Sequence, residues 1–396
     1  MFSALTARLQ VEVSVVNTVL ASNDRARNLL FGVAPAPGGG DTGAGDQIAP
    51  DHIETLRAYI SPLPEKLDWQ IYDHCTAVTR LYAAYERFVN DLVSGYVSML
   101  PMLYPLFSDL PESISVNHRI GIGQILVKIG SRKQYKDLEE SAVIRALSSG
   151  LGSGTQYNLV PEAFLVERLN YRLGVIGKIF GNLGFDAATN RIVSHPAVAE
   201  FMRTTRGESD TAQGELESFV EYRNEAVHAT PGEILSPDEI KKIGRFICAI
   251  CEALADMVRD TAIQRHLQLG HSKTLGTITE MHYRGSIVVA RMNACSVRVG
   301  EDLFICGEQF YRKATVTSLR LEDQEIQEAA LQDGQELGIG FSVRARRGAE
   351  LRILSLPEPT ATAQMVPQPA PVQDNVEVSD ALDASELPPD EPQEGV

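Results

Sequence analysis

The chain lacks the features of a membrane-inserted protein or of a secreted, disulfide-bonded one. None of its 396 residues falls in a stretch of about 18 uninterrupted apolar residues, which a membrane-spanning helix needs. The amino-terminal segment has no basic lead, and Arg8, Glu12 and Asn17 interrupt its apolar positions, which argues against a signal peptide. The five cysteines are scattered and odd in number, so a disulfide framework is not expected. We therefore expect a cytoplasmic protein without membrane contact.

Sequence signals for a bound nucleotide or metal are also missing. There is no glycine-rich phosphate loop of the Walker type and no internal repeat. Cys248 and Cys251 form a C-x-x-C pair, but the pair lies within an apolar helical segment and has no second pair nearby. Buried cysteines that act as small apolar side chains are favoured there over a metal or redox site. We expect neither a metal nor a cofactor.

Basic residues are scarce, and the acidic excess is unevenly placed. The chain has 36 Lys and Arg against 52 Asp and Glu, a net charge of −16. Residues 356–396 hold nine acidic residues, eight prolines and no Lys or Arg, which predicts a disordered acidic tail. The rest of the chain carries about −7. The tail is interpreted as a solubilising segment or, alternatively, as a polyanion that competes with RNA for basic residues.

Apolar spacing predicts a mostly helical chain up to about residue 260. Ser236, Pro237 and Glu239 have the pattern of a helix start with a capping box, and that helix is expected to run to about 259. Pro101 is expected to end the helix that begins near Trp69. The other expected helices cover residues 1–31, 119–147, 161–180 and 211–228, and Pro/Gly-rich or Gly/Ser-rich breaks are expected at 34–50 and 148–155.

After residue 271 the pattern changes to short segments rich in β-branched residues. Seven such segments in about 80 residues are typical of a small antiparallel β-barrel. The predicted fold class is therefore multidomain α and β, with an all-α helical bundle followed by a barrel and a disordered tail. The expected domains are an N-terminal helix and loop (1–64), a helical domain (65–260), the barrel (271–355) and the tail (356–396).

The most informative motif joins Arg223, Asn224 and His228 near the end of one predicted helix. Five residues turn a helix by about 500°, so the Arg and His side chains stand roughly 140° apart, a gap that a long Arg side chain can close. The pair supplies a permanent cation and a group that titrates near neutrality. These are the groups needed to cut RNA without a metal. The alternative is an exposed helix end whose cations complement the helix dipole.

The helical part resembles the HEPN domain, an all-helical fold of many prokaryotic RNases, over about residues 65–260. Residues 217–228 match the family's acidic and apolar helix that ends in R-N-x-x-x-H. Residues 81–89 and 169–172 resemble the early and middle helices of its MAE-type subfamily. Departures are Ala229 in place of a common glycine, and the phosphate-repelling glutamates Glu215, Glu217, Glu221 and Glu225.

The resemblance implies a homodimer whose motif helices form a cleft with two copies each of Arg223 and His228. It implies RNA cleavage that leaves a 2′,3′-cyclic phosphate, with Asn224 orienting Arg223 or a phosphate. Glu86 is a candidate acid that orients Arg223 or His228, or else a partner in a surface ion pair. A separate apolar stripe is consistent either with the dimer interface or with burial inside one protomer; its members are Ile240, Ile243, Ile247, Ile250, Leu254 and Val258.

Residues 271–355 resemble the β-barrel that forms the second domain of translational GTPases such as elongation factor Tu. The matching stretches are 299–305, 314–319, 329–341 and 346–351. Such barrels contact tRNA or ribosomal RNA in translation factors. Here eleven basic residues balance eleven acidic ones, so RNA docking and protein docking both remain open.

Together these patterns predict a metal-independent endoribonuclease, of a toxin or antiviral defence kind, that acts on translation-related RNA such as tRNA or rRNA. An antitoxin or regulator protein is a candidate partner. The alternative is a non-catalytic, dimeric interaction or RNA-binding protein that uses the two domains as docking modules.

Overall fold

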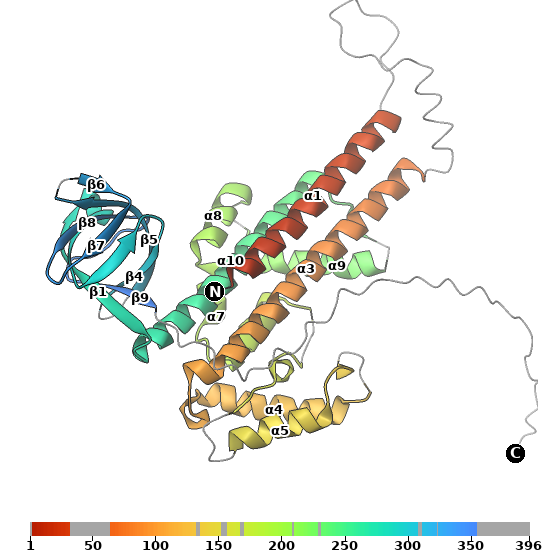
Figure 1. Cartoon of the computed structure of the whole chain (residues 1–396). Coiled ribbons are helices and arrows are strands. Elements are labelled where there is room, and N and C mark those ends of the chain that lie inside the picture. The colour runs from red at the N-terminus through yellow and green to blue at the C-terminus, as the bar shows by residue number, and fades with distance from the viewer. Residues whose placement is uncertain are drawn as a thin grey trace, which may run out of the picture. The chain divides into compact units, whose positions relative to one another are not determined.

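The computed structural model describes residues 2–31, 64–131, 135–151, 157–166, 170–207, 210–228, 231–307, 311–322 and 324–354. The chain divides into two units, residues 1–355 and 356–396. The loop expected at 34–50, residues 152–155 of the break expected at 148–155, and the tail at 356–396 lie outside the described residues. The first half of that break is wrong, because residues 148–151 are the end of a helix, α5 (Glu140–Leu151). Within the first unit, a helical region precedes an antiparallel sheet (Figure 1).

Helices and the segments that connect them make up the described chain as far as residue 268. Three of the helices, α1, α3 and α10, pack along one another, and α9 packs across α3 (Figure 1). The helices are α1 (Ser3–Phe31), α3 (Lys66–Leu103), α4 (Glu112–Lys128), α5 (Glu140–Leu151), α6 (Leu173–Asn182), α7 (Ala188–Val193), α8 (Pro196–Thr205), α9 (Ala212–Val227) and α10 (Pro237–Gln268), with 3-10 turns at Phe107–Asp109 and Pro161–Phe164.

The apolar stripe of α10 lies inside the protein. Every member from Ile240 to Val258 is at most 3% exposed, because α1, α3 and α8 pack against this helix. Of the two alternatives for this stripe, burial inside one protomer is therefore correct, and the stripe offers no surface for a dimer interface.

Several predicted helix boundaries are wrong. α3 continues through Pro101, because the missing proline N–H costs one hydrogen bond while Tyr104 N–H still reaches Leu100 O at 2.7 Å and Leu100 and Leu103 are fully buried. α4 begins seven residues early, at Glu112, and α10 runs nine residues past 259. The helix expected over 161–180 is a 3-10 turn followed, from Leu173, by α6.

A buried ion pair joins α1 to α3. Arg27 is 2% exposed and Asp73 is 6% exposed, and their side chains are in direct contact. Asn23 Nδ2 donates a second hydrogen bond to Asp73, at 2.7 Å. The carboxylate thus has two α1 partners, which fix how the amino-terminal helix sits on α3.

His118 on α4 should make the helical region sensitive to acid. Its side chain is 1% exposed and its Nε2 accepts a 2.9 Å hydrogen bond from Val160 N–H, so the neutral ring is the form that fits. Burial lowers the pKa of His118 to about 4. Between about pH 6.5 and pH 4, His118 is therefore protonated in the unfolded chain and neutral in the folded chain. The free energy of unfolding falls as the pH drops through this range, by about 3 kcal/mol for this group.

Urea unfolding followed by circular dichroism, at neutral pH and near pH 4.5, checks this expectation. Gln at position 118 can still accept from Val160 but does not titrate, so His118→Gln should show a shallower loss of stability in this window. Equal pH dependence in the two proteins would contradict the assignment.

The strands begin at residue 272. In the described chain they form a seven-stranded sheet and a two-stranded sheet of β3 and β7, and all pairings are antiparallel. All seven expected segments are strands, and β6 and β7 are additional. The strands are β1 (Ser272–His282), β2 (Ile287–Met292), β3 (Cys295–Arg298), β4 (Asp302–Cys306), β5 (Tyr311–Leu321), β6 (Gln324–Ile326), β7 (Glu328–Leu331), β8 (Glu336–Phe341) and β9 (Glu350–Leu354).

The strand pairings form a closed ring. The order is β4-β9-β1-β2-β8-β5, and β5 pairs again with β4. Residues that alternate along these strands, such as Val288 and Ala290 on β2 and Leu337 and Ile339 on β8, are fully buried and form a core separate from that of the helices. β3 and β7 pair with each other.

Among the helices that the structure describes, none combines the length and apolar character needed to cross a membrane.

Candidate functional site

The motif residues lie at the carboxyl end of α9. Thr211 caps the start of this helix, because its side-chain oxygen accepts from Gly214 N–H at 3.0 Å. The helix ends at Val227, and His228 is its C-cap with φ −90° and ψ 4°. Arg223 and Asn224 therefore sit in the last turns, and His228 is the first residue outside the helix.

Neutral groups hold the Arg223 guanidinium. Its Nη1 donates to Asn170 Oδ1 at 3.2 Å and to Asn224 Oδ1 at 3.1 Å, and its Cζ lies 4.5 Å from the centre of the Tyr82 ring. Within the described part of the chain no carboxylate pairs with Arg223, and its Nε and Nη2 make no hydrogen bond. The side chain is fixed in place, yet its charge is not neutralised.

The segment beside Arg223 is not the helix that the sequence suggests. Residues 170–172 are non-helical, because hydrogen bonds to α3 take the place of helical ones; Leu169 lies outside the described residues. Tyr171 N–H donates to the Tyr82 hydroxyl at 2.9 Å, and the Tyr85 hydroxyl donates to Tyr171 O at 3.0 Å. Tyr82 thus both anchors this segment and supports the guanidinium that Asn170 contacts.

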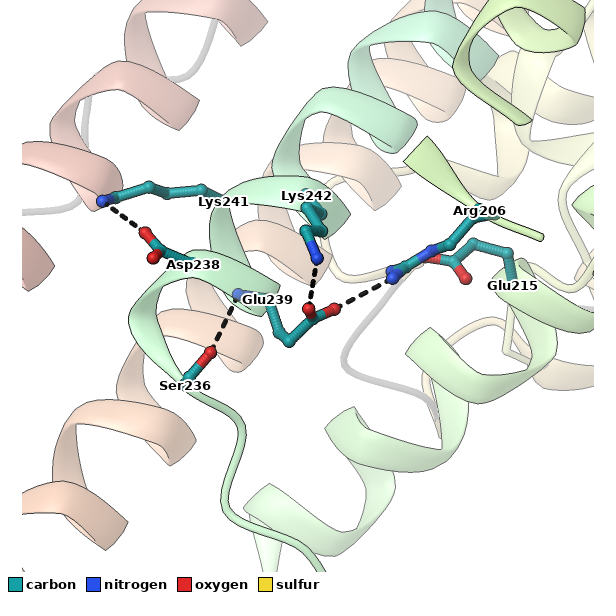
Figure 2. A network of polar contacts seen from close by, with 7 residues as sticks. All are labelled: Arg206, Glu215, Ser236, Asp238, Glu239, Lys241 and Lys242. Atoms are coloured by element: carbon teal, nitrogen blue, oxygen red, sulfur yellow. Dashed lines mark hydrogen bonds and ion pairs between the residues drawn. The ribbon is translucent and has the colours of Figure 1, made fainter. Parts of the chain in front are cut away.

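An ionic network fixes the other end of α9 (Figure 2). Arg206, just after α8, bridges Glu215 of α9 at 2.5 Å and Glu239 of α10 at 2.9 Å. Hydrogen bonds from Lys242 and Arg206 lower the pKa of Glu239. Ser236 accepts from Glu239 N–H at 3.2 Å, so the predicted cap is confirmed. A capping box would also have the Glu239 carboxylate accept from the backbone N–H of Ser236. That part of the prediction is wrong, because the carboxylate binds Lys242 and Arg206 instead.

The glutamates of α9 are largely engaged elsewhere. Glu221 pairs with Arg172 at 3.8 Å, and Glu217 accepts from Gln213 at 2.9 Å. Glu225 accepts from Gly232 N–H at 2.9 Å, which anchors the residues after the motif. The cationic partners of Glu215 and Glu221 reduce the negative potential that these two glutamates would otherwise bring to a phosphate, whereas the partners of Glu217 and Glu225 are neutral.

Among the described interactions, neither His228 nor Glu86 forms a hydrogen bond or ion pair with Arg223. His228 is exposed, and among the described residues its ring makes no hydrogen bond or ion pair. Glu86 is half-buried and likewise pairs with neither motif residue there; its charge acts on Tyr82. Burial, and to a smaller extent Glu86, raise the pKa of Tyr82, so its hydroxyl stays protonated. Within a single protomer, Arg223 is therefore hydrogen-bonded to Asn224, but no described hydrogen bond or ion pair links it to His228.

Asn170 and Tyr82 are the neighbours that the sequence did not single out as site residues. Both lie in stretches that resemble HEPN helices, but their contacts with Arg223 span 53 and 141 positions of chain, which no local pattern reveals. In the described ranges there is also no group of three or more His, Cys, Asp or Glu side chains placed to hold a metal.

Asn170→Asp tests the expectation from the sequence that this site binds RNA, and it should weaken that binding while leaving the fold intact. The carboxylate is isosteric with the amide and would stand next to the guanidinium, so it would neutralise the charge available to a phosphate. A charge-assisted contact is worth about 1.5–3 kcal/mol, which predicts a loss of roughly 10- to 100-fold in RNA affinity. Fluorescence anisotropy with labelled RNA measures it. Asn190→Asp on α7 adds the same charge at an exposed position and should bind as the wild type does; equal losses in both variants would contradict the role of Asn170.

The helical region that carries this R-N-x-x-x-H spacing matches a known family. The family model described as RiboL-PSP-HEPN matches residues 51–260, and because this is more than half of the chain, the protein belongs to that family. The match leaves α1 and the sheet outside it.

Comparison with other proteins adds little to this. No curated protein matches the chain. Two crystal structures of the C-terminal domain of a putative U32 peptidase from Geobacillus thermoleovorans, one of them a selenomethionine variant, resemble 20% of this chain. They are 13% and 12% identical, are covered over 99% and 89% of their own length, and have TM-scores of 0.19 and 0.18. Such scores support no conclusion about this chain.

Proposed function

We propose that the protein is a metal-independent endoribonuclease in which Arg223, Asn224 and His228 act on the RNA backbone. The observation that carries the proposal is that neutral groups hold the Arg223 guanidinium in place. Arg172 and Arg206 are paired with glutamates of α9, whereas Arg223 is held by two amides and an aromatic ring. A fixed, unneutralised guanidinium is suited to a phosphate whose charge grows in the transition state.

The chemistry that fits these groups is an internal transesterification. The imidazole of His228 takes the proton from a ribose 2′-hydroxyl, the 2′-oxygen attacks the adjacent phosphorus, and the bond to the 5′-oxygen breaks. The leaving oxygen takes up a proton, and the products end in a 2′,3′-cyclic phosphate and a 5′-hydroxyl. Arg223 steadies the phosphate, and Asn224 orients the guanidinium through its 3.1 Å hydrogen bond.

A second copy of the chain completes this proposal. His228 and Val227 are exposed together at the end of α9, with Val227 58% exposed. A homodimer that covers this end would bring a second motif to the first and supply the acid for the leaving oxygen. The buried α10 stripe plays no part in it.

The test is RNA cleavage in excess EDTA, with the product ends identified by mass spectrometry. Cleavage that persists and leaves cyclic phosphates supports the proposal. Cleavage that needs a divalent metal, or the absence of any cleavage by a folded dimer, counts against it.

The proposal extends to the cellular role. A toxin or antiviral defence nuclease of the MAE-type subfamily, controlled by an antitoxin or regulator protein in the cytoplasm, agrees with the motif. The closed ring of strands agrees with a barrel like the second domain of translational GTPases, which would direct the enzyme to tRNA or rRNA.

A non-catalytic, dimeric RNA-binding or interaction protein is the second candidate. The observation in its favour is His228, because no described side chain orients its ring, whereas a general base is usually held by a neighbouring group. Such a protein would bind RNA through Arg223 without cutting it, which the cleavage assay distinguishes.

A further inference from the structure

The β1–β2 hairpin tip and the β8–β9 loop lie together at one end of the strand ring. Ala345 N–H donates to Gly285 O at 2.7 Å, and Phe341 N–H donates to Ser286 O at 2.8 Å. Gly285 has φ +89°, and a side chain there would come within 2.8 Å of Ala345 O. Tip and loop are therefore locked to each other through their backbones.

The loop is strongly basic in a chain that is acidic overall. Residues 342–349 contain Arg344, Arg346 and Arg347 and no acidic residue. All three arginines are exposed, and Arg344 and Arg347 have no ion-pair partner among the described residues. The equal numbers of acidic and basic residues over 271–355 conceal this local concentration.

The hairpin tip adds an exposed aromatic ring. Tyr283 is 80% exposed and has φ +45°, a left-handed backbone conformation that an aromatic residue rarely adopts. Asn would fit this conformation with less strain, and the exposed ring gains little from packing. A strained, exposed residue of this kind points to a role outside folding. Met281 and Ile287, at 45% and 39% exposed, flank it, and the nearby Glu280 faces His282 at 3.6 Å.

We infer that this end of the sheet binds single-stranded RNA, through phosphates on Arg344 and Arg347 and a base stacked on Tyr283. Proteins bind single-stranded nucleic acids with clustered arginines next to an exposed aromatic ring. The cations bind the phosphates of the backbone, and the ring can stack on any base. An acidic protein partner would also complement the charge of the arginines, but binding it would not require an exposed, strained tyrosine at the hairpin tip. The surface lies outside the HEPN match, so it would present RNA independently of Arg223.

The test is fluorescence anisotropy of the full chain with a fluorescein-labelled, single-stranded RNA of roughly 12 nucleotides. All proteins carry His228→Ala so that the probe is not cut. Replacing both Arg344 and Arg347 by Ala should weaken binding at least about tenfold. It should also make the salt dependence shallower by about 1.4 in the slope of log K against log salt, since each phosphate contact on a single strand contributes about 0.7. The matched control, Arg312→Ala with Arg320→Ala, removes two exposed arginines of β5 and should bind as the parent does.

Tyr283 separates binding from stability. Tyr283→Asn should lower RNA affinity at least about fivefold while the melting temperature stays equal or rises, because the strain is relieved. Tyr283→Phe keeps the ring and should bind within about twofold of the parent. Three outcomes would overturn the inference: a parent protein that does not bind the probe, loop variants that bind like the control, or displacement of the probe by polyglutamate as effectively as by unlabelled RNA. Because only binding is read, a failure of cleavage by the wild type leaves this result unaffected.

Discussion

His228→Ala is expected to lower the rate of RNA cleavage by about 10²–10⁴-fold, the usual effect of removing a general base or acid. Loss toward the upper end is expected if two copies of His228 act in one dimeric site, since a single substitution removes both. Single-turnover cleavage of a labelled RNA, with circular dichroism and light scattering to verify the fold and the oligomeric state, measures the effect. Wild-type rates from the variant would favour the non-catalytic candidate.

Arg223→Lys tests the companion role in the same assay. Lysine keeps the charge but loses the planar fork and its two amide contacts, so cleavage should remain badly impaired. Arg203→Lys is the matched control, because Arg203 is an exposed arginine on α8 whose ion-pair partner within the described residues is Glu200. A rate for Arg223→Lys close to that of the control would show that a point charge is enough at this position.

Asp73→Ala is expected to destabilise the helical region by about 3–5 kcal/mol, because it leaves Arg27 buried without a counter-charge. For a region of this size the loss corresponds to a fall of roughly 6–20 °C in melting temperature. Asn23 would lose its acceptor as well. Differential scanning calorimetry measures the change.

The control joins the same two helices. Arg8 and Asp91 form an exposed ion pair between α1 and α3, and Asp91→Ala should cost no more than about 1 kcal/mol. Replacing Arg27 by Met together with Asp73 by Leu removes both buried charges and should restore most of the stability. A small effect of Asp73→Ala alone would mean that water reaches Arg27. Because α1 precedes the family match, this buried pair ties the amino-terminal helix to the HEPN region.

Local patterns predicted the parts of the fold that depend on neighbouring residues. The β-branched segments after 271 all became strands, and Thr211 and Ser236 start helices where the spacing of polar and apolar residues indicates. Packing changed the rest. Buried Leu100 and Leu103 carry α3 past Pro101, and tyrosines on α3 hold residues 170–172 out of a helix.

For the candidate site, too, some features followed from local sequence and others from tertiary packing. The sequence alone determined that Arg223, Asn224 and His228 follow one another at a helix end, because helix periodicity and the R-N-x-x-x-H spacing are local properties. It also determined that the chain contains a HEPN domain. Only the tertiary structure decided that Asn170 and Tyr82 hold Arg223 without neutralising it, that the α10 stripe is core, and that the basic β8–β9 loop lies against the hairpin tip that carries Tyr283. Each of these depends on contacts between distant segments, whose geometry is set by packing and by the hydrogen bonds that buried polar groups must find.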